Sequence, residues 1–350
     1  MPPRTLRVAI LAACFAGAAC FTGLGDACLA QMPAIAPLPG TGSLGQPADP
    51  DHFVFVVAGD NRPRHAGDPP TDTIQQIAAA VQVLQPAFLI TLGDTIFGKD
   101  PSSRSVIAGE YGAFFTVIHK AGVPVVNAPG NHEMDDGCDV PNATMQQWYG
   151  EIAGQPYGAF TYGNSRFIIV NTEEIAPPGV RSPTAAPAGK HEGAGGKDKD
   201  DACGDKDPGY VSAAQIAALR QDLDADKGKA HVFIFMHHPI EPEKKSSGLE
   251  KASAKALKKL FEGYSNVSFV LGAHEHLFFN PQDPANVATI PSRKDPGGKP
   301  YYLVSGGAGA KLAKHAPGAF FHYLVFEVSK DRVDVTLKKL PPPAAAHPAP

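Results

Sequence analysis

The sequence has no excess of basic residues and no apolar run that makes a convincing membrane span. Its formal net charge is −4 with both signs spread along the chain, so a nucleic-acid partner bound through phosphate neutralisation is not expected. The apolar stretch 8–23 is short and soon followed by Asp26, which argues against a transmembrane segment. With 350 residues, 43% of them hydrophobic, the chain can still bury a sizeable core.

Cysteine is scarce, and three of the five cysteines precede residue 31. The N-terminal region combines Arg4 and Arg7 with an apolar, alanine-rich stretch and small residues before Gln31, which is typical of a signal peptide over residues 1–30. We therefore expect an exported protein, periplasmic or secreted. A lipoprotein-like box ends at Cys14, but only a short apolar run separates it from Arg7, so soluble export is favoured over lipidation.

Cleavage after Ala30 would leave Cys138 and Cys203 as the remaining cysteines. An even pair in an oxidising compartment is a disulfide candidate, and two unpaired thiols are the alternative. Because no cysteine lies in the motifs below, a closed structural zinc site built on thiolates is not expected.

The remaining chain divides by composition. Residues 31–50 are rich in Pro, Gly and Ala and indicate a linker, and residues 51–340 indicate a single domain. Within it, residues 176–209 contain almost no large apolar side chain, which predicts a mobile insertion. Residues 341–350 indicate a disordered tail, and nothing in the sequence indicates an oligomeric state.

Apolar runs and helical spacings alternate through the domain. Helices are expected at residues 71–84, with Thr71 or Asp72 as the N-cap, and at 111–120, 212–224 and 252–261. Strands are expected at residues 53–58, 87–92, 123–127, 159–162, 166–171, 232–236, 267–271, 301–304, 322–328 and 333–337. This order predicts an α/β layered core with a site along one edge of a sheet.

Five of the expected strands run directly into side chains that bind metals. These side chains are two carboxylates, one amide and three imidazoles: Asp60, Asp94, Asn131, His237, His274 and His276. The mixed nitrogen and oxygen set suits Zn²⁺, Mn²⁺ or Fe. Six ligands are too many for one tetrahedral ion, so the pattern predicts two ions with one carboxylate bridging them.

In these motifs the sequence resembles the calcineurin-like metallophosphoesterases, a family that includes the purple acid phosphatases. The resemblance covers about residues 53–309, with the family's blocks in order: Gly59-Asp60-Asn61-Arg62, Gly93-Asp94, Gly130-Asn131-His132-Glu133, Met236-His237-His238-Pro239 and Ala273-His274-Glu275-His276. It implies an α/β fold in which a β-sandwich is flanked by helices, in α/β/β/α layers, with a dinuclear metal site at the strand C-terminal ends.

The resemblance also implies roles for individual residues. Asp60 and His276 would bind the first metal, Asp94 would bridge, and Asn131, His237 and His274 would complete the second metal site. His132 matches the catalytic histidine, which Glu133 would orient as a carboxylate–imidazole pair. From their positions in these blocks, Arg62, Asn131 and His238 are the expected substrate contacts, and Arg62 is also expected to be catalytic. For His238, which is adjacent to a ligand, simple packing is the alternative.

The expected reaction is metal-dependent hydrolysis of phosphate esters. Two cations would clamp the phosphate oxygens and lower the pKa of a bridging water, so that a hydroxide attacks phosphorus. His132 would then protonate the leaving oxygen. The sequence does not indicate which phosphate ester is the substrate.

Two positions depart from the family pattern. Arg62 stands where many members have a histidine ligand, and Phe97 stands where purple acid phosphatases have a tyrosine ligand. The first metal site is therefore short by one protein ligand. Asn61 would either supply its side-chain oxygen or cap the turn, and Arg62 is favoured for holding a substrate phosphate over forming a purely structural ion pair.

The alternatives are a non-catalytic metal-binding surface or interaction protein on the same fold, and a different class of metallohydrolase. The second lacks support because no His-x-His-x-Asp run of the β-lactamase type is present. A further glycine-rich stretch, residues 306–309, would form either an anion-binding nest or a tight turn beneath the site.

Overall fold

The computed structural model describes residues 31–137, 140–177, 180, 208–286, 290, 293–294 and 298–342. The predicted signal peptide, most of the predicted insertion, and both Cys138 and Cys203 lie outside the described residues. Most of the predicted tail also lies outside them. These expectations therefore remain predictions.

The strands fall close to the expected positions. They are β1 (Phe53–Ala58), β2 (Leu89–Thr91), β3 (Val125–Asn127), β4 (Gly158–Tyr162), β5 (Ser165–Ile169), β6 (His231–Phe235), β7 (Val267–Gly272), β8 (Phe278–Phe279), β9 (Arg293–Lys294), β10 (Tyr301–Ser305), β11 (His322–Val328) and β12 (Arg332–Lys339). The helices are α1 (Asp72–Leu84), α2 (Arg104–Ile118), α3 (Asn131–Met134), α4 (Ala143–Ile152), α6 (Ala213–Ala225) and α7 (Lys251–Phe261), with a 3₁₀ turn at His119–Ala121.

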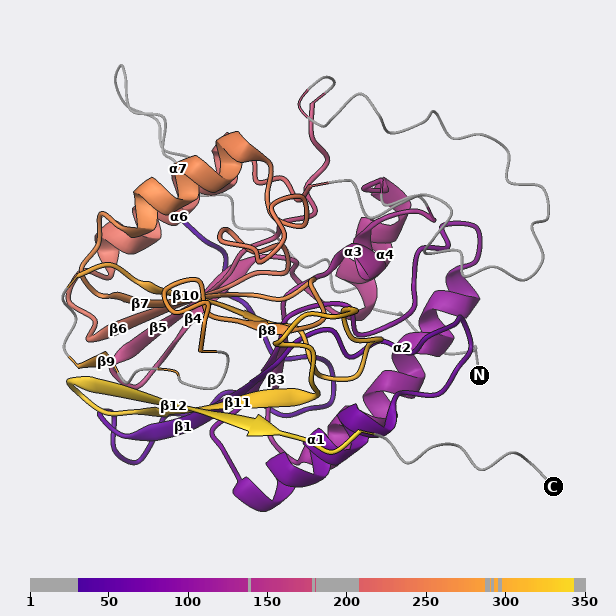
Figure 1. Ribbon diagram of the computed structural model, residues 1–350, viewed down its shortest axis with the longest axis horizontal. Coiled ribbons are helices and arrows are strands. Elements are labelled where there is room, and N and C mark those ends of the chain that lie inside the picture. The colour runs from indigo at the N-terminus through magenta and orange to yellow at the C-terminus, as the bar shows by residue number, and fades with distance from the viewer. Residues whose placement is uncertain are drawn as a thin grey trace, which may run out of the picture.

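Two six-stranded mixed sheets form the centre of the molecule (Figure 1). One sheet has the strand order β3-β2-β1-β11-β12-β9, and the other has the order β4-β5-β6-β7-β10-β8. Strands β1, β2 and β3 are parallel to one another, as are β5, β6, β7 and β10. The carboxyl ends of each parallel set therefore open at one edge of its own sheet, as the strand–helix order predicted.

Alternating side chains explain the layers. In β1, Phe55 and Val57 belong to the core between the sheets, whereas Val56 and Ala58 pack toward α1 and α2. A third core lies between the other sheet and the helices α6 and α7. The protein thus has the expected α/β/β/α arrangement, a β-sandwich flanked by helices, and the fold prediction is confirmed.

Aromatic rings dominate the layer between the sheets. Phe167 of β5 packs edge-on against Phe55 of β1, with ring centroids 5.2 Å apart, and stacks on Phe233 of β6 at 5.1 Å. Phe55 in turn stacks on Phe326 of β11 at 4.7 Å. These buried contacts join both sheets into one core.

Some elements differ from the sequence-based prediction. Helix α2 begins at Arg104, seven residues before the predicted start at Tyr111, and helix α4 was not predicted at all. Helix α4 buries only Met145 and Tyr149, so the helical spacing of its apolar residues is a weak signal in the sequence. Its N-terminus is capped by the Asn142 side chain, which accepts hydrogen bonds from the N–H groups of Thr144 and Met145. By contrast, Thr71 and Ser212 cap α1 and α6 at the predicted boundaries.

Residues 31–50, predicted as a linker, contact both sheets. The N–H of Ile35 donates to Ala159 in β4, and the N–H of Leu38 donates to Val125 in β3. Met32, Ile35 and Leu38 are buried. This segment adds core contacts although its composition suggests a flexible spacer.

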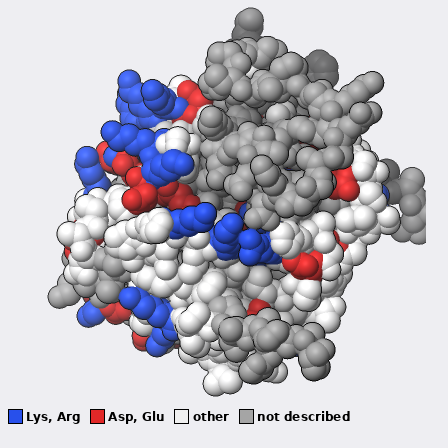
Figure 2. Space-filling view, turned by 45° about the vertical axis from the view of Figure 1, so that its right-hand side comes forward, with Lys and Arg blue, Asp and Glu red and all other residues white. Residues whose placement is uncertain are grey.

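None of the helices in the described part of the chain is long and apolar enough to cross a membrane. On the face drawn in Figure 2, Lys and Arg side chains lie in separate groups among acidic side chains.

Candidate metal centre

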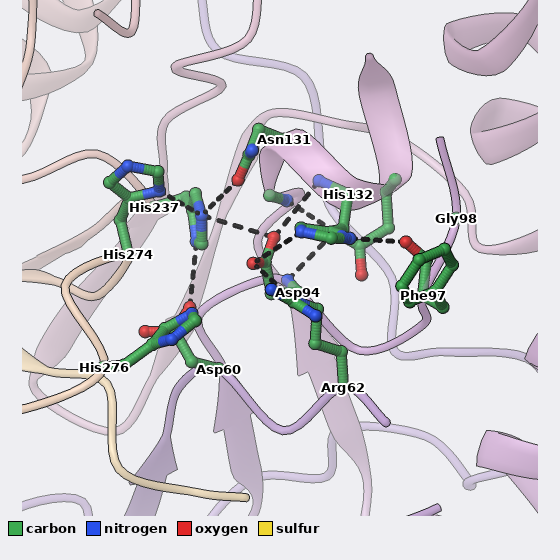
Figure 3. Close-up of polar contacts among 12 residues, drawn as sticks. Asp60, Arg62, Asp94, Phe97, Gly98, Asn131, His132, His237, His274 and His276 are labelled. Carbon is green, nitrogen blue, oxygen red and sulfur yellow. Dashed lines mark hydrogen bonds and ion pairs between the residues drawn. The ribbon is translucent and has the colours of Figure 1, made fainter. Parts of the chain in front are cut away.

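The six predicted ligands meet where the two parallel sets of strands end (Figure 3). Asp60 follows β1, Asp94 follows β2 and Asn131 follows β3, all in one sheet. From the other sheet, His237 follows β6, and His274 and His276 follow β7. Residues more than 200 positions apart in sequence are thereby brought within contact distance.

His237 lies at the centre of one half of this cluster. Its Nε2 atom is 3.0 Å from Oδ1 of Asn131, 3.3 Å from Oδ1 of Asp94 and 3.2 Å from Nδ1 of His274. His238 points elsewhere, and its Nδ1 contacts Glu173. The geometry thus places His237, rather than His238, among the potential ligands.

Asp60, Asp94 and His276 form the other half. One potential ligand atom from each lies within 4.8 Å of the other two. The Nε atom of Arg62 is 3.5 Å from Oδ2 of Asp94, and the Arg62 side chain is almost fully buried. Arg62 therefore adds a positive charge at the point where many family members place a histidine.

The imidazoles of His237 and His276 are oriented by backbone carbonyls. Nδ1 of His237 donates to Leu92 at 2.8 Å, and Nδ1 of His276 donates to Lys311 at 2.8 Å. A proton fixed on Nδ1 leaves the Nε2 lone pair to coordinate a metal. Both rings are therefore prepared as ligands.

The surroundings of Asp60 indicate whether the cluster suits a metal ion. Both its carboxylate oxygens are buried, and neither has a hydrogen-bond partner among the described residues. A buried carboxylate without donors is costly unless a cation compensates it. In addition, a Cβ placed on Gly306 would lie 2.1 Å from Oδ2 of Asp60, so only glycine fits beside it. The residues present fit a metal ion.

The backbone carries strain at the same positions. Asp60, Asp94, His274 and His276 have φ angles of 58°, 53°, 67° and 52°, in the left-handed region that residues with a Cβ seldom adopt. Such conformations cost of order 1–3 kcal/mol each and persist where the surroundings enforce them. Strain concentrated on potential ligands is typical of a functional site.

The electrostatics favour a positive charge on His237 but neutral rings at the other two imidazoles of the cluster. Burial alone would lower the pKa of His237, but the carboxylates of Asp94 and Asp60 raise it to about 9. Burial and Arg62 lower the pKa of His276 to about 4, and burial lowers the pKa of His274 well below its usual value. His274 and His276 are therefore neutral at pH 7 and offer lone pairs.

His132 is buried beside Asp94, with its Nε2 atom 3.9 Å from Oδ2 of that residue. The opposite ring nitrogen, Nδ1, donates to the backbone carbonyl of Phe97 (Figure 3). This carbonyl fixes the ring so that Nε2 faces the predicted metal ligands. Phe97 therefore contributes its backbone carbonyl, at the position where the sequence resemblance pointed to the tyrosine ligand of purple acid phosphatases.

The predicted pairing of Glu133 with His132 is wrong. Oε2 of Glu133 accepts from the N–H groups of Gly130 and Asp94, at 2.8 and 2.9 Å, and Oε1 accepts from the N–H and hydroxyl of Thr95, at 2.5 and 2.6 Å. Residues 132 and 133 are consecutive in α3, so their side chains point in different directions. Glu133 instead ties the turn after β2 to the turn after β3.

The glycine-rich stretch 306–309 forms a turn beneath the site. The N–H groups of Gly306, Ala308 and Ala310 donate to the backbone carbonyls of Leu277, Gly59 and Asp60. These three N–H groups are thus used within the protein and do not face an anion. Of the two alternatives, the structure favours the tight turn.

Asn61 does not cap its turn. Its side-chain oxygen and nitrogen are buried and have no hydrogen-bond partner among the described residues. The alternative in which Asn61 supplies an oxygen to the first metal site is therefore the one that stays open.

Sequence reasoning missed Lys99. It lies in the loop after β2, is half-buried, and its N–H donates to the carbonyl of His132 at 3.1 Å. Its positive charge contributes to lowering the pKa of Asp94, His132 and His274. The only signal in the sequence was a lysine two residues after Phe97, which is too common a pattern to single out.

Comparisons with known proteins show that this fold also occurs in solved structures. The fold is similar to that of a dimetal phosphatase from Danio rerio, at 14% identity and a TM-score of 0.56, over 83% of this chain and 96% of that one. It is also similar to the structure of PhoD, at 13% identity and a TM-score of 0.54, over 85% of this chain and 67% of that one. None of the curated protein sequences matches the chain significantly.

A match along the sequence shows the family directly. The model of the calcineurin-like phosphoesterases matches residues 44–278, about two-thirds of the sequence, and the chain belongs to that family. The resemblance found in the sequence motifs is confirmed. Hydrolysis of phosphoesters is the general activity that this membership supports.

Proposed function

We propose that the protein hydrolyses phosphate esters with two metal ions, Fe, Mn or Zn, bound by the cluster at the strand ends. The supporting observation is the buried carboxylate of Asp60, whose oxygens lack donors in a cluster of five other potential ligands. Asp60 and His276 would hold one ion, and Asn131, His237 and His274 the other. Asp94 lies between the two groups and would contact both.

When bound, such ions supply a water of lowered pKa and positive charge for the phosphate oxygens. The chain's own residues orient the substrate. Arg62 and Lys99 place two positive charges beside Asp94 and His132, where an incoming phosphate would neutralise them. Asn131 and His238 are further substrate contacts in this proposal.

His132 is the proposed proton donor to the leaving oxygen. Its Nδ1 proton is held by the Phe97 carbonyl, so a second proton would reside on Nε2, which faces the site. Burial and Arg62 lower the pKa of His132, and the negative charge of a bound phosphate would raise it. Glu133 acts as a positioning residue for the two turns.

The test is a kinetic and metal analysis of His132→Ala. We expect kcat to fall by roughly 10²–10⁴ because the leaving oxygen loses its proton donor. Metal content should stay at the wild-type level, since His132 binds neither ion. Unchanged kcat would contradict the assignment. Two bound ions without turnover in the wild-type protein would favour the alternative, a non-catalytic metal-binding surface or interaction protein.

We also propose that the protein is exported to the periplasm or the medium. This rests on the sequence of residues 1–30 alone. Export makes a Cys138–Cys203 bridge chemically reasonable, and titration of thiols in the denatured exported protein distinguishes the cases. We expect no free thiol, and two titratable thiols would contradict the bridge.

A further inference from the structure

His238 is a buried imidazole beside the metal cluster that is not among its ligands. Its Nδ1 is 2.7 Å from Oε1 of Glu173, and its N–H donates to the hydroxyl of Thr172. Its ring packs against that of His274 at a tilt, with centroids 4.0 Å apart and planes inclined by 33°. His238 thus joins a buried carboxylate to a predicted metal ligand.

Glu173 is firmly held by its neighbours. Its Oε1 atom also accepts from the Thr172 hydroxyl at 2.6 Å, its N–H donates to Oδ1 of Asn171, and its carbonyl accepts from Gln146. Burial would raise the pKa of Glu173, but His238 lowers it to about 2. The carboxylate is therefore charged and fixed at one end of the contact.

Gly209 closes the other side of the His238 ring. A Cβ at Gly209 would lie 2.7 Å from both Cβ and Cγ of His238, well inside van der Waals contact. The backbone there is fixed because Glu250 donates to the Gly209 carbonyl and Tyr210 donates to the Thr172 carbonyl, each at 2.7 Å. The ring can shift away from Gly209 only by disturbing its contacts with Glu173 and His274.

His274 differs from the other two imidazoles of the cluster. His237 and His276 each donate to a backbone carbonyl, whereas the described residues offer no such anchor to His274. Its Nδ1 faces Nε2 of His237, and its ring–ring contacts among the described residues are with His237 and His238. With a φ of 67° and partial exposure, His274 depends on this stacking for its orientation.

We propose that Glu173 and His238 form a positioning pair for His274, held in place by Gly209, and that the pair sets the affinity of the second metal site. The inference rests on the metal centre of the proposed function. It adds residues outside the ligand set that control one of the two ions. Outer-shell partners of metal-binding histidines commonly have this role.

The experiment is a titration of the metal-free protein with Zn²⁺ and with Mn²⁺ by calorimetry. We expect Glu173→Ala to weaken one of two binding events by about 10–100-fold and leave the other unchanged. Glu173→Gln keeps an oxygen that accepts from His238, so it should retain most of the affinity. Gly209→Ala should weaken the same event, because its Cβ displaces the His238 ring.

Gly228→Ala is the matched control, since a Cβ there meets no atom within 4 Å. It should bind both ions like the wild type. Far-UV circular dichroism of the metal-free variants verifies that each one is folded. If Gly209→Ala does not fold, Glu173→Ala still provides the test. A Co²⁺ absorption spectrum adds a direct readout of ligand geometry at the affected site.

Three outcomes overturn the inference in different ways. If the wild type binds two ions and Glu173→Ala binds both with wild-type affinity, the positioning pair is refuted while the proposed function stands. If the wild type binds no ion, both proposals fail together. Equal weakening of both binding events would also refute a role confined to His274.

Discussion

The layer between the sheets and the edge where their strands end differ in the kind of side chain that they bury. In the layer, Phe55, Phe167 and Phe326 are buried among other rings. At the edge, a few residues beyond the same strands, Asp60 is equally buried but its oxygens lack hydrogen-bond donors. Burial of the rings stabilises the folded protein, whereas burial of the carboxylate destabilises it.

This contrast teaches how the fold supports chemistry. Rigid strands packed on an aromatic layer can hold short turns in unfavourable backbone conformations, as at Asp60, Asp94 and His274. The strain and the buried charge persist because the surrounding core is stable enough to sustain them. We therefore expect changes at the edge to affect function more than stability, and changes in the layer to do the reverse.

His237→Ala should produce the largest effect on activity. His237 contacts Asn131, Asp94 and His274, so its removal opens one half of the cluster. We expect one bound ion and the catalytic activity to be lost together. Elemental analysis and phosphatase assays check this, and retained activity would place the ligands elsewhere.

Phe167→Ala should produce the opposite result. Its ring lies between both sheets, and truncating such a buried aromatic side chain costs about 3–5 kcal/mol. Urea unfolding of the metal-free variant measures the loss. Below its melting temperature the variant should bind both ions with nearly wild-type affinity. Loss of metal from a folded variant would contradict the expectation that changes in the layer affect stability more than function.

His322 gives the layer a pH dependence. Burial lowers its pKa to about 4 in the folded protein, against about 6.5 when unfolded. As the pH falls through this window the unfolded state binds the proton first, so stability is lost. We expect His322 to contribute a loss of about 2 kcal/mol between pH 7 and pH 5. In urea unfolding, His322→Gln should lose about 2 kcal/mol less stability than the wild type between pH 7 and pH 5. The control is His52→Gln, at an exposed histidine, which should show the same change of stability with pH as the wild type.

Asp60→Asn should produce the smallest change in stability, and the sign of that change is the most diagnostic. Removing a buried charge beside Asp94 should raise the unfolding free energy of the metal-free protein by about 1 kcal/mol. Binding at the first metal site should weaken strongly. Calorimetric melting with and without metal checks both effects. Destabilisation of the metal-free protein would show that Asp60 is a structural carboxylate.

The fold was largely predictable because its signals are local. The apolar run 53–58 forms β1 at the expected residues, and Thr71 caps α1 where the sequence suggested. The ligand cluster was predictable for a related reason, since parallel strands deliver the residues that follow them to one edge. Knowing the strands was enough to know which side chains meet.

The partners of those side chains were not predictable. Adjacency in sequence suggested that Glu133 orients His132, but neighbouring positions in a helix diverge, and a backbone carbonyl takes that role instead. The stacking of His238 on His274 and the approach of Gly209 depend on chain segments far apart in sequence. No periodicity or motif encodes such contacts.

The most direct test of the central claim is the metal content per chain, measured together with hydrolysis of an aryl phosphate monoester and diester. The account predicts about two ions per chain and turnover, with the faster ester indicating the substrate class. One ion or none, without turnover and without recovery on adding Mn²⁺, Zn²⁺ or Fe²⁺, would contradict it. Arg62 and Phe97 would then mark a site that has lost catalysis.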